Sequence, residues 1–73
     1  MANHNKQFLI FLGKKIREYR DKMGVSQEKL GEIAKLHRTY IGMIERGEKN
    51  ITITNLKRIA QALGLHVRDL IDF

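Results

Sequence analysis

The residue types that carry metal or nucleophilic chemistry are sparse in this chain. It contains three histidines, His4, His37 and His66, and no cysteine. The histidines are too far apart in the sequence to form a local pair of metal ligands, and no thiolate accompanies them. The only serine is Ser26, and there is no glycine-rich phosphate loop. We therefore expect no catalytic residues, no metal site, no cofactor and no small-molecule ligand.

The charge balance points instead to a polyanionic partner. The chain has 14 Lys and Arg against 8 Asp and Glu, a net charge of +6 and a pI near 10.0. Nucleic acid and an anionic membrane surface both fit such an excess. No stretch approaches the roughly 20 apolar residues that span a bilayer, and the apolar run 8–12 lacks the features of a signal peptide. We therefore expect no membrane association and a cytoplasmic location.

The elements that must position any contacts are predicted to be helices. With 73 residues and no proline, the chain has room for one domain, 1–73, with residues 1–6 as a flexible arm. Gly24, Gly47 and Gly64 each follow a helical pattern, where a left-handed C-cap favours glycine. The first helix is expected from Lys6 or Gln7 to Met23, and the second after the N-cap Ser26. A third is expected from Arg38 to about Glu45, a fourth after the N-cap Thr52, and a fifth beyond Gly64. The fold class is therefore all-α, with about five short helices.

Apolar residues at three- to four-residue spacing define the faces of these helices that are expected to point inward. They are Leu12, Ile16 and Tyr19; Leu30, Ile33 and Ala34; Ile41 and Ile44; and Ile53, Leu56, Ile59, Ala60 and Leu63, while a short last helix is expected to hold Val67, Leu70 and Ile71.

Two short helices joined by the tight break 35–37 match a helix-turn-helix unit over about 26–46. Further sequence segments make the match more specific: SQEKL (26–30), RTYI (38–41), IERG (44–47) and AQALG (60–64). Over roughly residues 10–72 the chain resembles the phage repressor and Cro family, which implies the lambda-repressor-like fold. The segment 37–52 is similar in particular to controller proteins of restriction–modification systems.

The resemblance implies a sequence-specific transcription regulator that binds double-stranded DNA. Such proteins act as homodimers on pseudo-palindromic operators and either contact or block RNA polymerase. Two alternatives stay open at this point. One is a phage-type repressor of the same fold, and the other is a small antitoxin or protein-interaction module.

In this motif the second helix lies in the major groove, with its N-terminal residues on the base edges. If Ile41 and Ile44 face the core, then Arg38, Thr39, Gly42, Met43 and Arg46 point outward. Arg38, Thr39 and Met43 are the predicted base contacts, with Arg38 suited to bidentate binding of guanine. The predicted phosphate contacts are Gln27, whose role the resemblance implies, and Tyr40, Arg46, Lys49 and Asn50.

Each of these residues also has an ordinary interpretation. Arg38 and Lys49 are also typical of solvated surface charges, and Met43 of an exposed surface methionine. Tyr40 is equally suited to packing part of its ring against the preceding helix. The order and spacing of the motifs, rather than any single residue, favour the DNA-binding interpretation.

The resemblance further implies a structural ion pair inside the fold, between Arg20 and Glu45. Helix-turn-helix family members commonly have glycine in the turn where this chain has Lys35, so Lys35 is expected to adopt an uncommon backbone conformation or a different turn.

A dimer surface is expected near the C-terminus. Val67, Ile71 and Phe73 are its predicted residues, whereas Leu70 is assigned to the core. The apolar residues Phe8, Ile10 and Phe11 are expected to cover the C-terminal end or to enlarge the dimer contact.

Overall fold

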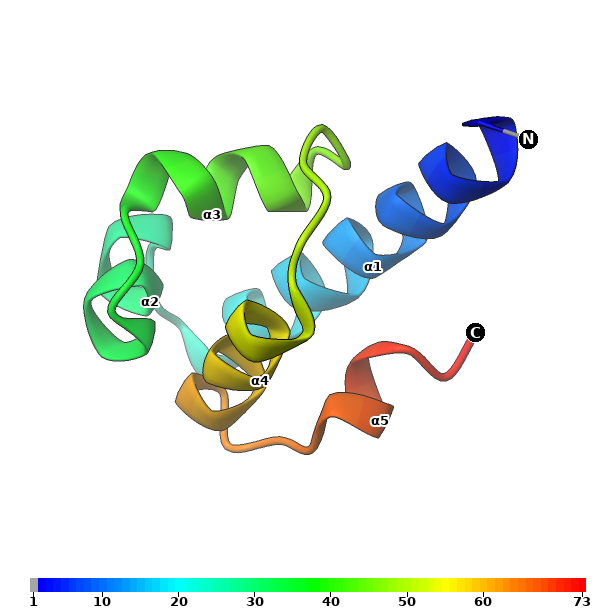
Figure 1. Ribbon diagram of the computed structural model, residues 1–73. Coiled ribbons are helices and arrows are strands. Elements are labelled where there is room, and N and C mark those ends of the chain that lie inside the picture. Colours follow the sequence, from blue (N-terminus) through cyan, green and yellow to red (C-terminus); the bar gives the residue numbers. More distant parts are fainter. Residues whose placement is uncertain (1) are drawn as a thin grey trace.

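The computed structural model describes residues 2–73, with side chains from Lys6 onward, and this part of the chain contains helices and no strand. The helices are α1 (Ala2–Met23), α2 (Gln27–Ala34), α3 (Arg38–Glu45), α4 (Ile53–Ala62) and α5 (Val67–Leu70). α3 packs on α2 and α1, α4 packs on α2, and α5 packs on α4 and α1 (Figure 1). The predicted all-α class with about five helices is confirmed.

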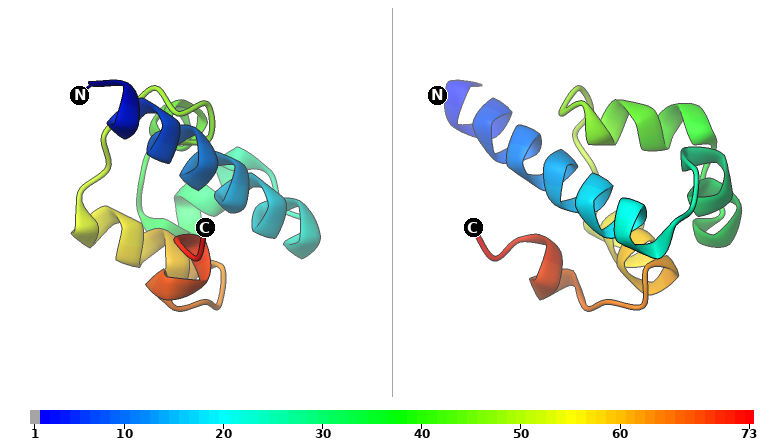
Figure 2. Two further views of the ribbon diagram at one scale, coloured as in Figure 1. Left: turned by 90° about the vertical axis from the view of Figure 1, so that its right-hand side faces the viewer. Right: turned by 180° about the vertical axis from the view of Figure 1, so that it is seen from behind.

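The first helix is longer than predicted. It begins at Ala2 rather than at Lys6 or Gln7. Met1 lies outside the described residues. The reason is that residues 2–12 contain neither proline nor glycine, the two residue types that most strongly interrupt a helix. The N-terminal end of α1 and the C-terminal segment lie at the same end of the molecule (Figure 2).

The sequence signals for helix ends are confirmed. The Ser26 hydroxyl accepts a hydrogen bond from the Lys29 amide at 2.9 Å, and the Thr52 hydroxyl accepts one from the Asn55 amide at 3.1 Å. Gly24, Gly47 and Gly64 adopt left-handed φ angles of 76°, 74° and 74°. Each of these glycines follows directly on a helix or its C-cap residue.

One core lies between the helices. It is formed by ten buried residues: Leu12, Ile16, Leu30, Ala34, Ile41, Ile44, Leu56, Ile59, Ala60 and Leu70. The prediction that Ile33 and Ile53 point inward was wrong, since they are 42% and 70% exposed. α2 buries only the narrow stripe that holds Leu30 and Ala34, and Ile33 falls beside it. Ile53 is the first residue of α4, a full turn before the buried Leu56.

The crossing of α1 and α3 depends on Gly13, a residue for which the sequence predicted no role. A Cβ atom on Gly13 would lie 2.5 Å from the backbone carbonyl oxygens of both Ile44 and Glu45. Only a residue without a side chain allows the end of α3 to approach α1 this closely. Gly13 therefore sets the position of α3 relative to the core.

We expect Gly13→Ala to lower the free energy of unfolding by about 2–3 kcal/mol, because the new methyl group overpacks against backbone that cannot rotate away. Gly42→Ala is the matched control, since a Cβ there would meet only the flexible ends of Arg46 and Gln27, at 3.1 and 3.3 Å. Its unfolding free energy should stay within about 1 kcal/mol of wild type, because the gain in helix propensity offsets mild crowding. Urea unfolding followed by circular dichroism measures both. Equal stability of the two variants would contradict the assignment.

Candidate nucleic-acid interface

α3 lies along an outer edge of the molecule, above α2 in Figure 1, and it packs on α2 and α1. The turn between α2 and α3 is built without glycine at its left-handed position, where Lys35 has φ 61° and ψ 42°. Gly31 makes this turn possible, because a Cβ there would lie 2.4 Å from the Leu36 carbonyl oxygen. The Leu36 amide in turn donates to the Gly31 carbonyl at 2.8 Å. The expectation of an uncommon conformation at Lys35 is confirmed.

The first residues of α3 are held in place by His37. Its Nδ1 atom accepts a hydrogen bond from the Thr39 amide at 3.0 Å, which caps the helix. This contact needs an unprotonated Nδ1 with its lone pair toward the backbone. Arg38 and Thr39 are thereby presented as exposed side chains at the start of the helix.

The three predicted base contacts lie outside the core. Arg38 and Thr39 are exposed and Met43 is half-buried, whereas Ile41 and Ile44 are 0% and 2% exposed. A neighbouring acid accompanies the arginine, because Nη1 of Arg38 lies 3.4 Å from a carboxylate oxygen of Glu28 on α2. A guanidinium carries five N–H donors, so this contact leaves donors free for another acceptor.

The prediction that Gly42 points outward was wrong. Gly42 is buried, because the side chains of Gln27 and Arg46 lie over it, within 3.3 and 3.1 Å of where its Cβ would be. The glycine thus lets two predicted phosphate contacts pack on the same turn of α3. Spacing alone could not show this, since Gly42 has no side chain whose direction the periodicity describes.

The predicted phosphate contacts differ in how firmly they are held. Gln27 is half-buried, and its Nε2 donates to Glu45 Oε1 at 3.0 Å. Tyr40 is also half-buried, and its hydroxyl oxygen accepts a hydrogen bond from Asn55 Nδ2 at 3.1 Å. Lys49 and Asn50 are exposed in the loop between α3 and α4.

Arg46 also has an acidic neighbour. Its Nε lies 2.9 Å from a carboxylate oxygen of Glu48, and both side chains are more than half exposed. This hydrogen bond raises the pKa of Arg46 and lowers the pKa of the Glu48 carboxyl below its usual value. A phosphate group would therefore compete with Glu48 for the guanidinium.

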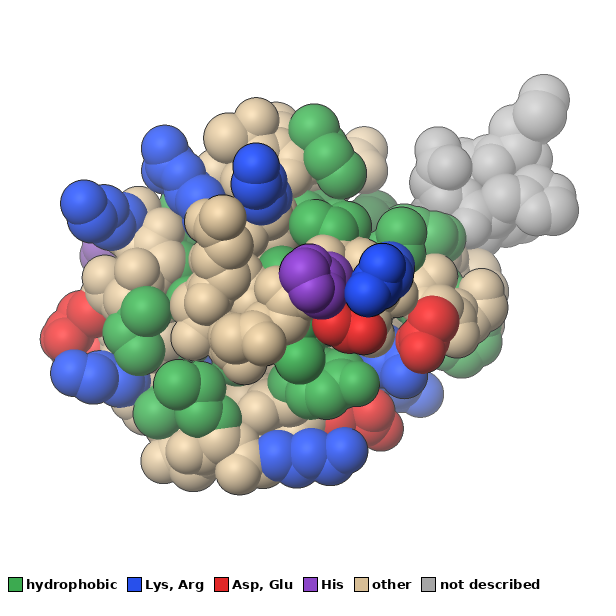
Figure 3. All heavy atoms as spheres, turned by 90° about the horizontal axis from the view of Figure 1, so that it is seen from below, with side chains coloured by type: hydrophobic (Ala, Val, Ile, Leu, Met, Phe, Trp, Pro, Cys, Tyr) green, Lys and Arg blue, Asp and Glu red, His purple; other side chains and the backbone are tan. Residues whose placement is uncertain are grey.

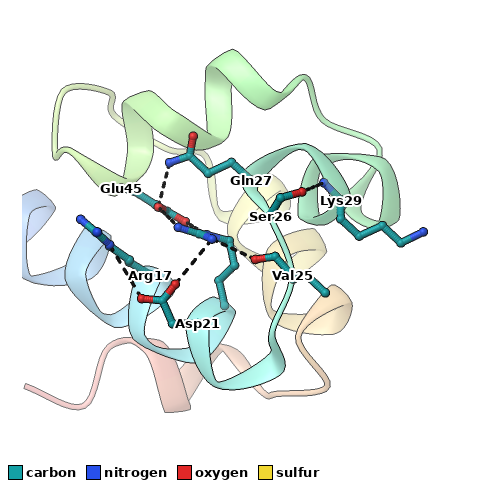
Figure 4. A network of polar contacts seen from close by, with 8 residues as sticks. Arg17, Asp21, Val25, Ser26, Gln27, Lys29 and Glu45 are labelled. Atoms are coloured by element: carbon teal, nitrogen blue, oxygen red, sulfur yellow. Dashed lines mark hydrogen bonds and ion pairs between the residues drawn. The ribbon is translucent and has the colours of Figure 1, made fainter.

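Arg20 and Glu45 are paired inside the fold (Figure 4). Nε and Nη2 of Arg20 donate to the two carboxylate oxygens at 2.7 and 3.1 Å, and Nη1 donates to the Val25 carbonyl at 2.9 Å. The Glu45 side chain is 3% exposed and that of Arg20 is 12% exposed. The hydrogen bond to Glu45 raises the pKa of Arg20. Because Gln27 donates to the same carboxylate, the network ties together α1, the first turn of α2 and the end of α3.

Replacing Glu45 with Gln keeps the size and the acceptor oxygen of the side chain but leaves the Arg20 charge with only the exposed Asp21 carboxylate, 3.6 Å from Nη1, as a counter-ion. We expect Glu45→Gln to lower the unfolding free energy by about 3 kcal/mol. Glu48→Gln removes the same charge from an exposed pair and should leave the melting temperature unchanged. Thermal melts at neutral pH compare the two. A Glu45→Gln protein as stable as wild type would rule out a structural role for the pair.

The sequence profile of the HTH_3 helix-turn-helix family matches residues 16–70. The chain is 46% identical over 65 residues to the control protein C.BamHI of Bacillus amyloliquefaciens, covering 88% of this chain and 80% of the relative. It is 47% identical over 60 residues to the control protein C.SmaI of Serratia marcescens, covering 82% and 71%.

A solved structure shows the same arrangement. The restriction-modification controller protein C.AhdI from Aeromonas hydrophila superposes with a TM-score of 0.84 at 39% identity, over 85% of this chain and 94% of that one. The chain therefore belongs to the HTH_3 helix-turn-helix family of DNA-binding transcription regulators, which are not enzymes. The family resemblance and the lambda-repressor-like fold inferred from the sequence are confirmed.

Two further properties concern the described residues only. None of their helices is long and apolar enough to cross a membrane. Among the same described residues, no group of three or more His, Asp or Glu side chains is placed so that it could hold a metal ion.

Proposed function

We propose that the chain is a restriction–modification controller, a sequence-specific regulator that binds pseudo-palindromic operators in double-stranded DNA as a homodimer. The observation that supports this most directly is the exposed start of α3, where Arg38 and Thr39 lie at the capped N-terminus of the helix with their side chains outside the core. The similarity to two control proteins and to C.AhdI supports the controller role. Its site of action would be the cytoplasm, beside a promoter, where it could contact or block RNA polymerase.

Arg38 suits the reading of a guanine. The donors that the Glu28 contact leaves free match the O6 and N7 acceptors in the major groove. Thr39 adds a hydroxyl for a base and a methyl group for thymine, and Met43 adds an apolar contact. Each good bidentate contact is worth about 1–3 kcal/mol of discrimination against the wrong base.

Phosphate contacts would then fix the register of α3 in the groove. Gln27 at the start of α2 and Tyr40 and Arg46 on or next to α3 are assigned this role, together with the exposed loop residues Lys49 and Asn50. The face that carries α4 and α5 is less suited to DNA, because acidic and hydrophobic side chains are interspersed there among the basic ones (Figure 3).

Selection from random-sequence duplexes, followed by sequencing, tests this function. We expect wild type to recover a two-fold symmetric site, with affinity that falls steeply as salt rises. Arg38→Ala should relax one base position in each half-site and weaken binding by about 1–3 kcal/mol. Lys49→Ala should weaken binding to all sequences alike and reduce the salt slope by about one. If wild type enriches no sequence, the regulator proposal fails.

The proposed dimer surface is apolar. Ile71 and Phe73 are 38% and 50% exposed. Val67 is half-buried against the core, so it contributes less to the proposed dimer surface. Ile53, at 70%, and Phe8, at 45%, extend the surface. A shallow hollow between α1, the start of α4 and the C-terminal segment is lined by Phe8, Leu9, Leu12, Asn50, Ile51, Ile53, Leu56 and Ile71. A second copy of the same surface would cover this hollow isologously.

We expect Ile53→Lys to shift the protein from dimer to monomer, because it places a charge in the centre of this apolar surface. Ile33→Lys is the matched control, since Ile33 is 42% exposed and borders a different hollow on the other side of α4, with Arg58 and Gln61. Analytical ultracentrifugation at micromolar concentration distinguishes the two states. Should Ile53→Lys remain as dimeric as Ile33→Lys, the interface must lie elsewhere.

A further inference from the structure

The hydrogen bond that joins α4 to α3 has a defined direction. Asn55 Nδ2 donates to the Tyr40 hydroxyl oxygen at 3.1 Å, and both side chains are half-buried. An amide nitrogen can only donate, so the tyrosine oxygen is the acceptor in this pair. The hydroxyl proton of Tyr40 is therefore left for a different acceptor.

We propose that Asn55 is a positioning residue for DNA binding, which fixes the Tyr40 hydroxyl as a donor toward a backbone phosphate. This inference rests on the proposed function, in which Tyr40 contacts phosphate, and it adds a residue from outside the helix-turn-helix unit. A phosphate oxygen accepts but cannot donate, so a phenol whose proton is already committed to a protein acceptor would bind it poorly. Asn55 keeps that proton available.

The placement of Asn55 supports such a role. It lies in the first turn of α4, where the Thr52 hydroxyl accepts from its backbone amide at 3.1 Å. Its backbone is thus fixed by the helix cap, while its side chain reaches across to α3. The next residue, Leu56, is 5% exposed and anchors this turn in the core. A tyrosine ring tethered at its far end loses less rotational freedom on binding than a free one.

Reversing this hydrogen bond provides the test. In Asn55→Asp the carboxylate can only accept, so it captures the Tyr40 proton and also adds a negative charge. Thr54→Asp is the matched control, because it adds the same charge at the adjacent, exposed position of α4. Both acids lie in the first helical turn, where the helix dipole favours them equally.

Dissociation constants are measured on a duplex that carries the site selected by the wild type, for both acidic variants, with Tyr40 intact and in the Tyr40→Phe variant. We expect Tyr40→Phe alone to weaken binding about tenfold, the size expected for a hydrogen bond to a charged group. With Tyr40 intact, Asn55→Asp should bind about tenfold more weakly than Thr54→Asp. In the Tyr40→Phe variant the two acids should weaken binding equally, because there is no proton to capture.

The alternative is that the hydrogen bond only joins α3 to α4. It predicts that Asn55→Asp lowers the melting temperature more than Thr54→Asp does, and that their affinities differ equally with and without the tyrosine hydroxyl. That result overturns the proposal, as does a Tyr40→Phe protein that binds like wild type. If the wild type selects no site at all, the proposed function fails, and this inference with it. Equal melting temperatures combined with a hydroxyl-dependent difference in affinity establish the positioning role.

Discussion

The buried pair of Arg20 and Glu45 is the interaction on which the proposed DNA-binding surface depends. Its carboxylate receives hydrogen bonds from α1 and from Gln27 at the start of α2, while belonging itself to the last turn of α3. Removing two charges from water is costly, and only such complete hydrogen bonding offsets that cost. The consequence is geometric: the angle between α2 and α3 is fixed by polar contacts with defined directions, in addition to apolar packing that tolerates small shifts. Gly13 adds a steric limit at the same place, since the carbonyl of Glu45 lies against it.

Around this fixed point, the surface of α3 is not simply positive. Arg38 and Arg46 lie beside Glu28 and Glu48. Exposed ion pairs of this kind contribute little to stability, so their effect is better understood through binding. If Arg38 and Arg46 contact DNA as proposed, each carboxylate would compete with phosphate for its arginine and repel the DNA backbone, which would weaken attachment to arbitrary sequence. A base edge that accepts hydrogen bonds from the remaining donors of Arg38 would be affected less by this competition. The neighbouring acids would therefore favour discrimination between DNA sequences over affinity for DNA in general.

The sequence predicted those features of the fold that depend on local chemistry. Helix caps at Ser26 and Thr52 and the left-handed glycines follow from rules that need no tertiary information, and all of them are confirmed. Errors arose where burial depends on neighbouring elements. Ile33 and Ile53 fit helical stripes, yet no helix covers them. The length of α1 was underestimated because no sequence signal marks its start.

The candidate site shows the same division. Residue types and motif spacing were enough to predict base contacts that lie outside the core on α3, and their contact with DNA stays a prediction. Contacts between helices could not be predicted, since they depend on distances of a few ångströms across the fold. Asn55 is the clearest case: nothing in its own segment suggests a link to Tyr40. Gly42 is another, because its burial comes from side chains of other turns that fold over it.

The size of the domain links its stability to its proposed dimerisation. A chain of 73 residues buries only a modest fraction of its surface, and part of its apolar side chain area remains exposed around Phe8, Ile53 and Phe73. The Phe73 ring already packs on Phe8 and Phe11, with ring centroids 5.2 and 5.5 Å apart, so the C-terminal segment and α1 would present one surface to a second copy. Dimer formation would bury that surface and stabilise the folded state by mass action. A regulator built in this way gains occupancy of a two-fold symmetric site more steeply than in proportion to its concentration. The same contacts that complete its core would then set the concentration at which it acts.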